Sequence, residues 1–308
     1  MVEILLATYN GGLYLEEQLN SLLDQTYSDI RILVRDDGST DRTAEIVKHY
    51  EQSHSGKVVL LRDGTGCGGP AQNFLRLVSH ATAPYIMFAD QDDYWFPEKV
   101  EKTLQKMKEL EQDQGGETPV LVFSDYRPVD EHLEELEFHH KNSQIAAFHL
   151  ELNRLLVQNY VTGGTIMANR SLYKKLGQYD PAMEMHDWWA ALYASAAGIL
   201  YHLPEELMLY RQHGNNCVGA VDVKSFRYRI HKFLDKRTKL SQQRYLAQAE
   251  CFYQRYSVEL GEEEKRILEG FMEIWSGKHG KFGRMYRLLK GRYLKSDLVR
   301  VLGQLWYV

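Results

Sequence analysis

Short apolar runs alternate with helical patterns along the first part of the chain. The runs show little alternation of apolar and polar positions, which is typical of strands buried on both faces of a sheet. They occupy residues 2–7, 30–35, 57–61, 85–89 and 120–123. Between the first two runs, Leu15, Leu19, Leu22 and Leu23 recur at helical spacing. This order predicts an α/β domain with a mostly parallel sheet flanked by helices.

Polar clusters directly follow three of these predicted strands. Ligands bind to parallel sheets at the edge where the strands have their carboxyl ends. The first cluster is TYNGG at residues 8–12, where glycines let a backbone approach a ligand and a following helix N-terminus favours anions. A plain tight turn explains the same residues. The chain has neither GxGxxG nor GxxxxGK[ST], which argues against dinucleotide and P-loop sites.

The second cluster is DDGSTD at residues 36–41. Ser39 and Asp41 have an ordinary explanation as turn and cap residues. Asp36 and Asp37 are not needed for that turn. We therefore expect one of these two carboxylates to accept a hydrogen bond from a pyrimidine base or a ribose hydroxyl.

The third cluster is Asp90-Gln91-Asp92-Asp93. Three carboxylates so close together repel one another unless a cation neutralises them. The spacing of a calcium-binding EF-hand loop is absent from the sequence around them. The cluster predicts a hard divalent ion that bridges a diphosphate, and a solvated acidic turn is the alternative.

Three later segments carry further candidate residues. Asp187 lies between His186 and two tryptophans, where burial would raise its pKa and suit it to act as a general base; a helix cap is the alternative. In YRQHGNN (210–216), His213 could bind a metal and Arg211 a diphosphate, although a lone histidine is more often structural. Gly163 and Gly164 leave room for a ligand to approach the backbone closely, or form an ordinary turn.

Composition and length describe a globular protein. The chain has 308 residues, of which 44% are hydrophobic and 26% charged, enough for two domains or for one domain with a large appendage. Three widely spaced cysteines make a disulfide framework or a zinc ribbon unexpected and favour a reducing compartment. The sequence shows neither a signal peptide nor an apolar run long enough to span a bilayer. We therefore expect a cytoplasmic protein that is soluble or peripheral on the inner face of the cell membrane.

Charge divides the chain into two parts. Residues 1–222 carry 18 Lys and Arg against 33 Asp and Glu, whereas residues 223–308 carry 19 against 9. The change of sign predicts a catalytic domain over 1–222 and a basic, mainly helical region over 223–308. An anionic membrane or a nucleic acid would suit a basic surface, and a solvated helical face is the plain alternative. We do not expect nucleic acid, because no known motif is present and the acidic part would repel a phosphate backbone.

Taken together, the clusters resemble those of family 2 inverting glycosyltransferases, most closely bacterial rhamnosyltransferases that use dTDP-L-rhamnose. The resemblance covers residues 2–218. It rests on five motifs in order: LATYNG (6–11), DDGSTD (36–41), ADQDDYW (89–95), HDWW (186–189) and YRQHGNN (210–216). It implies the GT-A fold, a Rossmann-like sheet that binds the nucleotide on one side and the acceptor on the other.

The resemblance also implies a donor site. The residues that it places around the nucleotide sugar are Thr8, Tyr9, Asn10, Asp36, Asp37, Gln72, Asn73, Asp90, Gln91 and Arg211. Among them, Asp36 would contact the base. Many relatives carry an arginine that touches the donor, and this chain offers Gln72 and Asn73 in that segment instead.

The resemblance also implies which residues hold the metal, act as the catalytic base and surround the acceptor. The resemblance assigns Mg²⁺ or Mn²⁺ to Asp90, Asp92 and His213, with Asp92 as the direct ligand, and the catalytic base to Asp187. The residues that it places around the acceptor or sugar are Gly163, Gly164, His186 and Trp188. The implied activity is metal-dependent transfer of L-rhamnose to a cell-envelope or capsular glycan, free or lipid-linked. The alternatives are a UDP-hexose or UDP-N-acetylhexosamine transferase of the same fold and a non-catalytic carbohydrate-binding relative.

The last segment of the chain has a pattern of its own. Residues 278–308 hold eight Lys and Arg and a single acid, Asp297. Phe282, Met285, Tyr286 and Leu289 fall at the spacing of one helical face. Such a helix suits the interface of an anionic membrane, and the same apolar stripe would equally suit packing on the catalytic domain. The sequence leaves both interpretations open.

Overall fold

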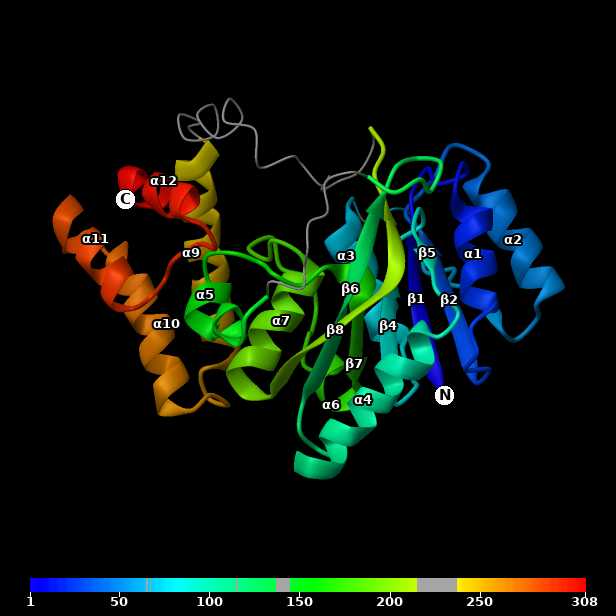
Figure 1. Ribbon diagram of the computed structural model, residues 1–308, viewed down its shortest axis with the longest axis horizontal. Coiled ribbons are helices and arrows are strands. Elements are labelled where there is room, and N and C mark those ends of the chain that lie inside the picture. Colours follow the sequence, from blue (N-terminus) through cyan, green and yellow to red (C-terminus); the bar gives the residue numbers. More distant parts are fainter. Residues whose placement is uncertain (65, 67, 115, 137–144, 215–236) are drawn as a thin grey trace.

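The computed structural model describes residues 1–64, 66, 68–114, 116–136, 145–214 and 237–308. Figure 1 shows a sheet covered by helices, with a group of further helices at one end of the molecule. The strands of the described chain are β1 (Val2–Thr8), β2 (Ile30–Asp36), β3 (Val58–Leu60), β4 (Tyr85–Ala89), β5 (Tyr94–Trp95), β6 (Val120–Val129), β7 (Ile166–Asn169) and β8 (Ile199–Arg211).

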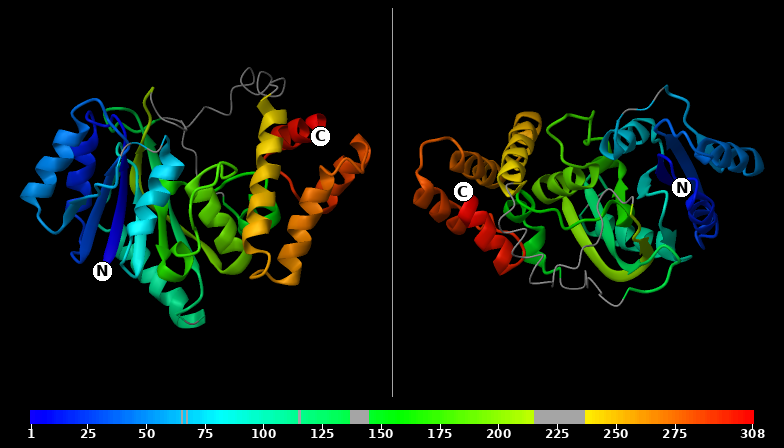
Figure 2. Two further views of the ribbon diagram at one scale, coloured as in Figure 1. Left: turned by 180° about the vertical axis from the view of Figure 1, so that it is seen from behind. Right: turned by 90° about the horizontal axis from the view of Figure 1, so that it is seen from above.

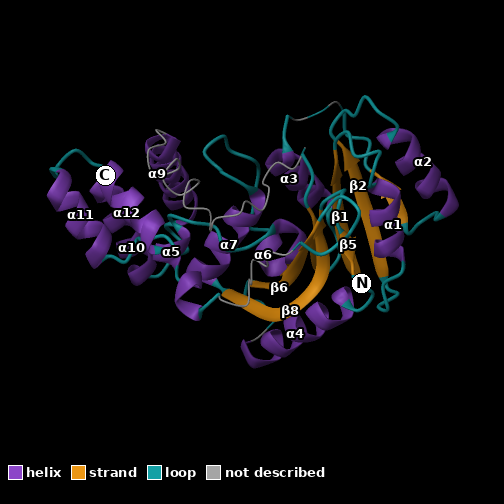
Figure 3. Cartoon of the chain, turned by 45° about the horizontal axis from the view of Figure 1, so that its top comes forward, coloured by secondary structure: helices purple, strands orange, loops and turns teal. Residues whose placement is uncertain are grey.

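The strands form an eight-stranded sheet in the order β3-β2-β1-β4-β7-β6-β8-β5 within the described part of the chain. From β3 to β4 every pairing is parallel, as predicted. Beyond β4 the sheet becomes mixed, because β7 runs antiparallel to both of its neighbours and β5 runs antiparallel to β8. Figure 3 shows this sheet as one curved layer. The α/β prediction is confirmed, and the sheet is less uniformly parallel than expected.

Helices cover both faces of the sheet, and each layer has its own hydrophobic cluster. The helices up to the last strand are α1 (Leu15–Leu23), α2 (Thr43–Ser53), α3 (Pro70–His80), α4 (Lys99–Gln114), α5 (Leu152–Leu155), α6 (Arg170–Tyr173) and α7 (His186–Ala197), with short 3₁₀ turns η2 (Ala147–Leu150) and η3 (Gly163–Thr165). Neighbouring residues of β1 point to opposite faces, so Ile4 packs with α1, α2 and α4, and Leu5 packs with α3 and α7.

Four helices at the C-terminus pack against the layer that contains α3 and α7. They are α9 (Arg237–Tyr256), α10 (Glu262–Ile274), α11 (Lys281–Lys290) and α12 (Leu298–Tyr307). Trp189 of α7 lies 5.3 Å from the ring of Phe252 in α9, and its indole N–H donates to the Tyr256 hydroxyl at 3.1 Å. Figure 2 shows α9 beside α7, with α10, α11 and α12 farther out. The predicted boundary at residue 222 falls outside the described residues, so the division into 1–222 and 223–308 stays a prediction.

No helix in the described ranges is long and apolar enough to cross a bilayer.

Candidate functional site

Three of the predicted clusters lie together at the carboxyl ends of β1, β2 and β4. Thr8 is in register with Asp36 across the parallel β1–β2 pair, and its hydroxyl donates to the Asp36 carboxylate at 2.9 Å. Gln91, just beyond β4, accepts from the Tyr9 N–H at 2.8 Å and donates to the Tyr9 carbonyl at 2.9 Å. The sheet therefore brings together one edge of polar side chains, as the strand pattern predicted.

Asp36 is part of the turn that follows β2, contrary to our expectation that the turn did not need it. Its Oδ2 accepts from the Ser39 N–H at 2.9 Å, and its Oδ1 accepts from the Ser39 hydroxyl at 2.5 Å. Asn10, at φ 49°, accepts from the Thr40 N–H at 2.9 Å and so ties the turn after β1 to the turn after β2. Both turns are fixed by side chains before any ligand binds.

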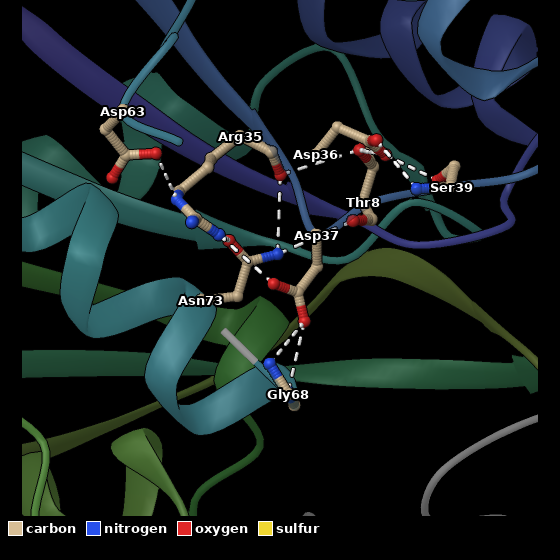
Figure 4. A network of polar contacts seen from close by, with 9 residues as sticks. Thr8, Arg35, Asp36, Asp37, Ser39, Asp63, Gly68 and Asn73 are labelled. Atoms are coloured by element: carbon tan, nitrogen blue, oxygen red, sulfur yellow. Dashed lines mark hydrogen bonds and ion pairs between the residues drawn. The ribbon is translucent and has the colours of Figure 1, made fainter. Parts of the chain in front are cut away.

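A buried arginine that the sequence analysis missed organises the neighbouring part of the edge (Figure 4). Arg35 is 2% exposed; its Nε donates to Asp63 at 2.8 Å and its Nη1 to Asn73 at 2.9 Å. The same Nη1 lies 3.2 Å from Asp37 Oδ1, while Asp37 Oδ2 accepts from the N–H groups of Gly68 and Gly69 at 3.2 and 3.1 Å. Arg35 therefore links the end of β2 to the first turn of α3.

This network corrects the assignment of Asn73 to the donor. The Asn73 side chain is buried and hydrogen-bonds to Arg35 through both its oxygen and its nitrogen. It supports the turn from inside the protein and does not present its amide to a ligand. Gln72 is half-buried in the first turn of α3 and remains a candidate donor contact. A charged residue inside an apolar strand, as Arg35 is, was the available sequence signal.

The acidic turn after β4 brings Asp92 and His213 together. His213 Nε2 lies 2.8 Å from Asp92 Oδ2, although the two residues are far apart in the sequence. The Asp92 side chain is 17% exposed and that of His213 is 11% exposed, so both are largely buried. Half-buried Asp90 lies on the same turn, and its pKa is raised to about 7 by burial first and then by the charges of Asp92 and Asp187.

Beneath this turn, Lys99 of α4 is fully buried, and sequence analysis had not singled it out. Its ammonium donates to the Gly164 carbonyl at 2.5 Å and lies 3.7 Å above the Trp95 ring. Burial raises the pKa of Asp93, and the charges of Asp92 and Asp90 raise it further. Burial lowers the pKa of Lys99, and the attraction between Lys99 and Asp93 opposes the shift of each. Asp93 Oδ2 has no hydrogen-bond partner among the residues described. A lone lysine at the start of a helix gives no sequence signal of such burial.

Arg211, expected to contact the diphosphate, is instead engaged inside the protein. It is 2% exposed, and its guanidinium donates to the Asp92 carbonyl at 2.8 Å, to the Glu131 carbonyl at 2.6 Å and to the Glu17 carboxylate. These bonds fasten the end of β8 to the acidic turn. Because His213 follows two residues later, Arg211 positions the histidine beside Asp92 rather than offering its own charge to a ligand.

The Gly163–Gly164 turn lies between the acidic turn and Asp187. A Cβ on Gly164 would lie 3.1 Å from Asp93 Oδ2 and 3.5 Å from Asp90 Oδ2. A Cβ on Gly163 would lie 3.6 Å from Asp187 Oδ2. The nearest atom to a Cβ on Gly163 would be His186 Nε2, at 3.1 Å, so at both positions an added side chain would force a neighbour to shift. The turn therefore lies close to the carboxylates of both Asp90 and Asp187.

Asp187, at the start of α7, is 9% exposed. Burial raises its pKa to about 7, and hydrogen bonds from the N–H groups of Trp188 and Gly163 limit the rise. The Trp188 N–H donates to its Oδ1 at 2.5 Å. A carboxyl group with such a pKa accepts protons near neutral pH, which is the property that a general base requires.

His186 and Trp188, expected to line the acceptor pocket, are buried. The His186 ring stacks on Phe74 at 4.0 Å and meets Phe88 edge-on at 4.7 Å. Burial lowers its pKa to about 3, and neither ring nitrogen has a partner within the described residues. The Trp188 indole donates to the Leu155 carbonyl at 2.6 Å. These side chains pack around Asp187 and do not form an open pocket.

The residues present suit a divalent ion that is shared with a substrate. The described chain contains no group of three or more His, Cys, Asp or Glu that would hold a metal by itself. Asp92 Oδ2 and His213 Nε2 nevertheless converge at 2.8 Å, with Asp90 on the same turn. Mg²⁺ is commonly held by one or two carboxylates, with substrate phosphates and water completing its shell. The donor set therefore fits a metal that binds together with a diphosphate.

Comparison with solved structures identifies the fold. TarS 1-349 of S. aureus, solved in complex with UDP, superposes with a TM-score of 0.56 at 17% identity, covering 99% of this chain and 89% of that one. The mannosyltransferase PcManGT from Pyrobaculum calidifontis, in complex with GDP-Man and Mn²⁺, gives 0.53 at 18% identity, covering 98% and 77%. The predicted GT-A fold is confirmed.

Sequence comparison identifies the family. The dTDP-rhamnosyl transferase RfbG of Shigella flexneri is 27% identical over 234 residues, which cover 70% of this chain and 74% of RfbG. The putative glycosyltransferase EpsE of Bacillus subtilis is 28% identical over 234 residues, covering 74% and 78%. The model of the family described as glycosyl transferase family 2 matches residues 3–177, more than half of the chain. The protein therefore belongs to glycosyl transferase family 2, as its motifs predicted.

Proposed function

We propose that this glycosyltransferase moves a sugar from a nucleoside diphosphate to a glycan hydroxyl with inversion at the anomeric carbon. One observation carries the proposal: Gly164 lies against Asp90, which shares a turn with the Asp92–His213 pair, and the adjacent Gly163 lies against the buried Asp187 carboxylate. The diphosphate leaving group would lie beside Asp92 and His213, and the attacking hydroxyl would lie beside Asp187. Opposite placement of leaving group and nucleophile is what a single displacement requires.

The proposed reaction is a one-step exchange of bonds. The acceptor oxygen forms a bond to the anomeric carbon while the bond from that carbon to the β-phosphate oxygen breaks. Asp187 takes the hydroxyl proton, which its pKa of about 7 allows near neutral pH. The nucleoside diphosphate leaves with the electron pair, so a β-linked donor yields an α-glycoside.

On the donor side, the chain's own residues hold the leaving group. Asp92 and His213, with Asp90 beside them, would bind Mg²⁺ or Mn²⁺. When bound, the ion neutralises charge that develops on the diphosphate. Thr8, Tyr9, Asn10, Asp36 and Asp37 form the edge where the nucleotide would lie, and Gln91 fixes the backbone of Tyr9 there.

We infer that the donor is dTDP-L-rhamnose. Support comes from the motif resemblance and from the name of the Shigella relative, a dTDP-rhamnosyl transferase. The UDP-hexose or UDP-N-acetylhexosamine alternative is favoured by the structural neighbours, since TarS was solved with UDP and with UDP-GlcNAc. The proposed acceptor is a cell-envelope or capsular polysaccharide, and a relative named for teichuronic acid biosynthesis is consistent with that class.

A panel of nucleotide sugars tests these proposals directly. Release of nucleoside diphosphate is measured for dTDP-L-rhamnose, UDP-glucose, UDP-N-acetylglucosamine and GDP-mannose, with added Mn²⁺ and with EDTA. We expect turnover with dTDP-L-rhamnose that EDTA abolishes. Preference for a UDP-sugar would overturn the donor assignment, and undiminished turnover in EDTA would overturn the metal.

Substitution of the base tests the mechanism. Asp187→Asn should lower kcat by about 10²–10⁴-fold, the usual contribution of a positioned general base, with donor affinity nearly unchanged. Asp113→Asn, an exposed carboxylate on α4, is the matched control and should turn over normally. If wild type releases no diphosphate from any donor, the chain is a non-catalytic relative. If Asp187→Asn retains its turnover, the base is another group.

A further inference from the structure

Two helices at the C-terminus present apolar side chains to solvent. On α11 the exposed fractions are 84% for Phe282, 62% for Tyr286 and 49% for Leu289. On α12, Leu298, Leu302 and Trp306 are 79%, 57% and 59% exposed. Within each helix these positions are spaced by three or four residues, so they share one face. We call these six side chains the α11–α12 face.

The opposite sides of the same helices provide the packing. Leu288 of α11 is buried, and Gln304 of α12 donates to the Tyr293 carbonyl at 2.8 Å in the turn between the helices. The apolar stripe predicted from the sequence therefore does not serve to hold α11 on the catalytic domain: only Met285 packs against the core, while Phe282, Tyr286 and Leu289 point outward. Of the two interpretations left open by the sequence, the structure disfavours packing of this stripe on the catalytic domain.

The two helices adjoin at both ends. Residues 291–297 connect the end of α11 to the start of α12, and Lys281 at the start of α11 donates to the Trp306 carbonyl at 2.9 Å. The Lys281 ammonium also lies 4.9 Å from the centre of the Trp306 ring. Figures 1 and 2 show α11 and α12 at the end of the molecule away from the sheet. The exposed side chains thus lie on two neighbouring helices at the same end of the molecule.

Positive charge lies beside this apolar face, at both ends of α11. Lys278, Lys281, Lys290 and Arg292 are exposed, and none forms an ion pair with a carboxylate in the described ranges. The single acid of the segment, Asp297, is paired with Arg300 at 3.1 Å. A second copy of the chain would bring these like charges together, whereas an anionic bilayer attracts each of them.

We propose that the α11–α12 face docks on an anionic phospholipid membrane. The six apolar side chains enter the headgroup boundary, and the lysines and arginines beside them bind lipid phosphates. Neither signal alone gives firm binding, and here the apolar side chains of α11 and α12 are combined with exposed basic residues at the two ends of α11. In this arrangement the helices lie on the membrane without crossing it.

Short contacts join the docking surface to the catalytic base. Asn153 and Arg154 of α5 donate to the carbonyls of Gly291 and Leu294, in the turn between α11 and α12, at 3.0 and 2.8 Å. Leu155 of the same helix accepts from Trp188, the neighbour of Asp187. Docking therefore fixes the acceptor side of the site relative to the bilayer. Resting on the proposed function, this predicts a lipid-linked acceptor, presented at the membrane surface.

Vesicle sedimentation tests the docking without any substrate. Full-length protein is mixed with vesicles of phosphatidylglycerol and phosphatidylcholine, or of phosphatidylcholine alone, at low and high salt. We expect binding to the anionic vesicles that high salt releases. Phe282→Ser with Leu302→Ser, and separately Lys278→Glu with Lys290→Glu, should each weaken binding at least about tenfold. Val258→Ser, 95% exposed outside this face, and Lys108→Glu, exposed on α4, are the matched controls.

The proposal would be overturned if wild type did not bind anionic vesicles, or if both double variants bound them as strongly as wild type. Self-association of wild type that the variants abolish without any vesicle binding would also overturn it, since a second copy would then be the occupant. Circular dichroism and thermal unfolding check that the variants fold. Nucleoside diphosphate release with a water-soluble acceptor should be unchanged in them. If wild type itself released no nucleoside diphosphate, this would count against the proposed function and leave the docking result unaffected.

Discussion

The raised pKa of Asp187 predicts a specific dependence of activity on pH. Burial at the start of α7 raises this pKa from an ordinary value of 3.8 to about 7. A general base works only in its deprotonated form, so kcat/KM should increase as pH rises through this pKa. A solvent-exposed aspartate in the same role would be ionised throughout that range and would give no such change.

The size of the effect follows from the titration of one group. With a pKa of about 7, roughly one tenth of Asp187 is ionised at pH 6, half at pH 7 and about nine tenths at pH 8. We therefore expect kcat/KM to rise about tenfold between pH 6 and pH 8 and to level off above. Below pH 6 the profile should fall with a slope of about one decade per pH unit.

Initial rates of nucleoside diphosphate release, at low acceptor concentration and several Mn²⁺ concentrations, provide the measurement. The metal series matters because the pKa of Asp90 is also raised to about 7, by burial and by Asp92 and Asp187. If titration of Asp90 caused the rise of kcat/KM, the pH of the rise would shift with metal concentration. If titration of Asp187 caused it, the rise would disappear in Asp187→Asn. A flat profile between pH 5 and pH 8, or an unchanged rise in that variant, would refute the reasoning.

Three further substitutions probe the rest of the site. Asp92→Ala, which removes the carboxylate 2.8 Å from His213, should raise the Mn²⁺ concentration for half-maximal rate at least about tenfold, while Asp113→Ala should not. Lys99→Met should lower the free energy of unfolding by about 3–5 kcal/mol in urea titrations, because it leaves buried carboxylates uncompensated; an effect no larger than that of Lys108→Met would contradict this. Gly164→Ala, whose Cβ would lie 3.1 Å from Asp93, should reduce kcat by about 10²-fold while the protein still folds, and normal turnover would show that the turn tolerates displacement.

The sequence predicted those strands that contain a short, mostly apolar run. β1, β2, β3, β4 and β6 lie in the middle of the sheet or on its parallel side, where both faces are covered by helices. β8 was missed because Pro204, Glu205 and Glu206 interrupt its apolar pattern, and β7 was missed because it has only four residues. Neither strand can be recognised locally, since each exists through pairing with strands distant in the sequence.

Within the site, the sequence pointed to several candidate residues. It did not show which of the polar side chains are bonded inside the protein. Asp92 and Asp187 were singled out by their local context, a cluster of carboxylates and a pair of tryptophans, and their roles stay predictions, as does that of His213. Asn73 and Arg211 look equally polar in the sequence, yet both are buried and bonded to internal partners. The direction of a side chain depends on contacts with distant segments, which residue type and spacing do not encode.

These internal bonds also explain how a site made of loops keeps its shape. Asp37 accepts from the N–H groups of Gly68 and Gly69 while its other oxygen lies against Arg35, so the loop before α3 is fixed to the end of β2. Gln91 holds the backbone of Tyr9 in the same manner. Polar groups oriented in advance need little reorganisation when charge develops on a ligand. Because Arg35 is buried at the centre of this network, any contribution that it makes to catalysis would be indirect, through the position of Asp37 and of the loop before α3.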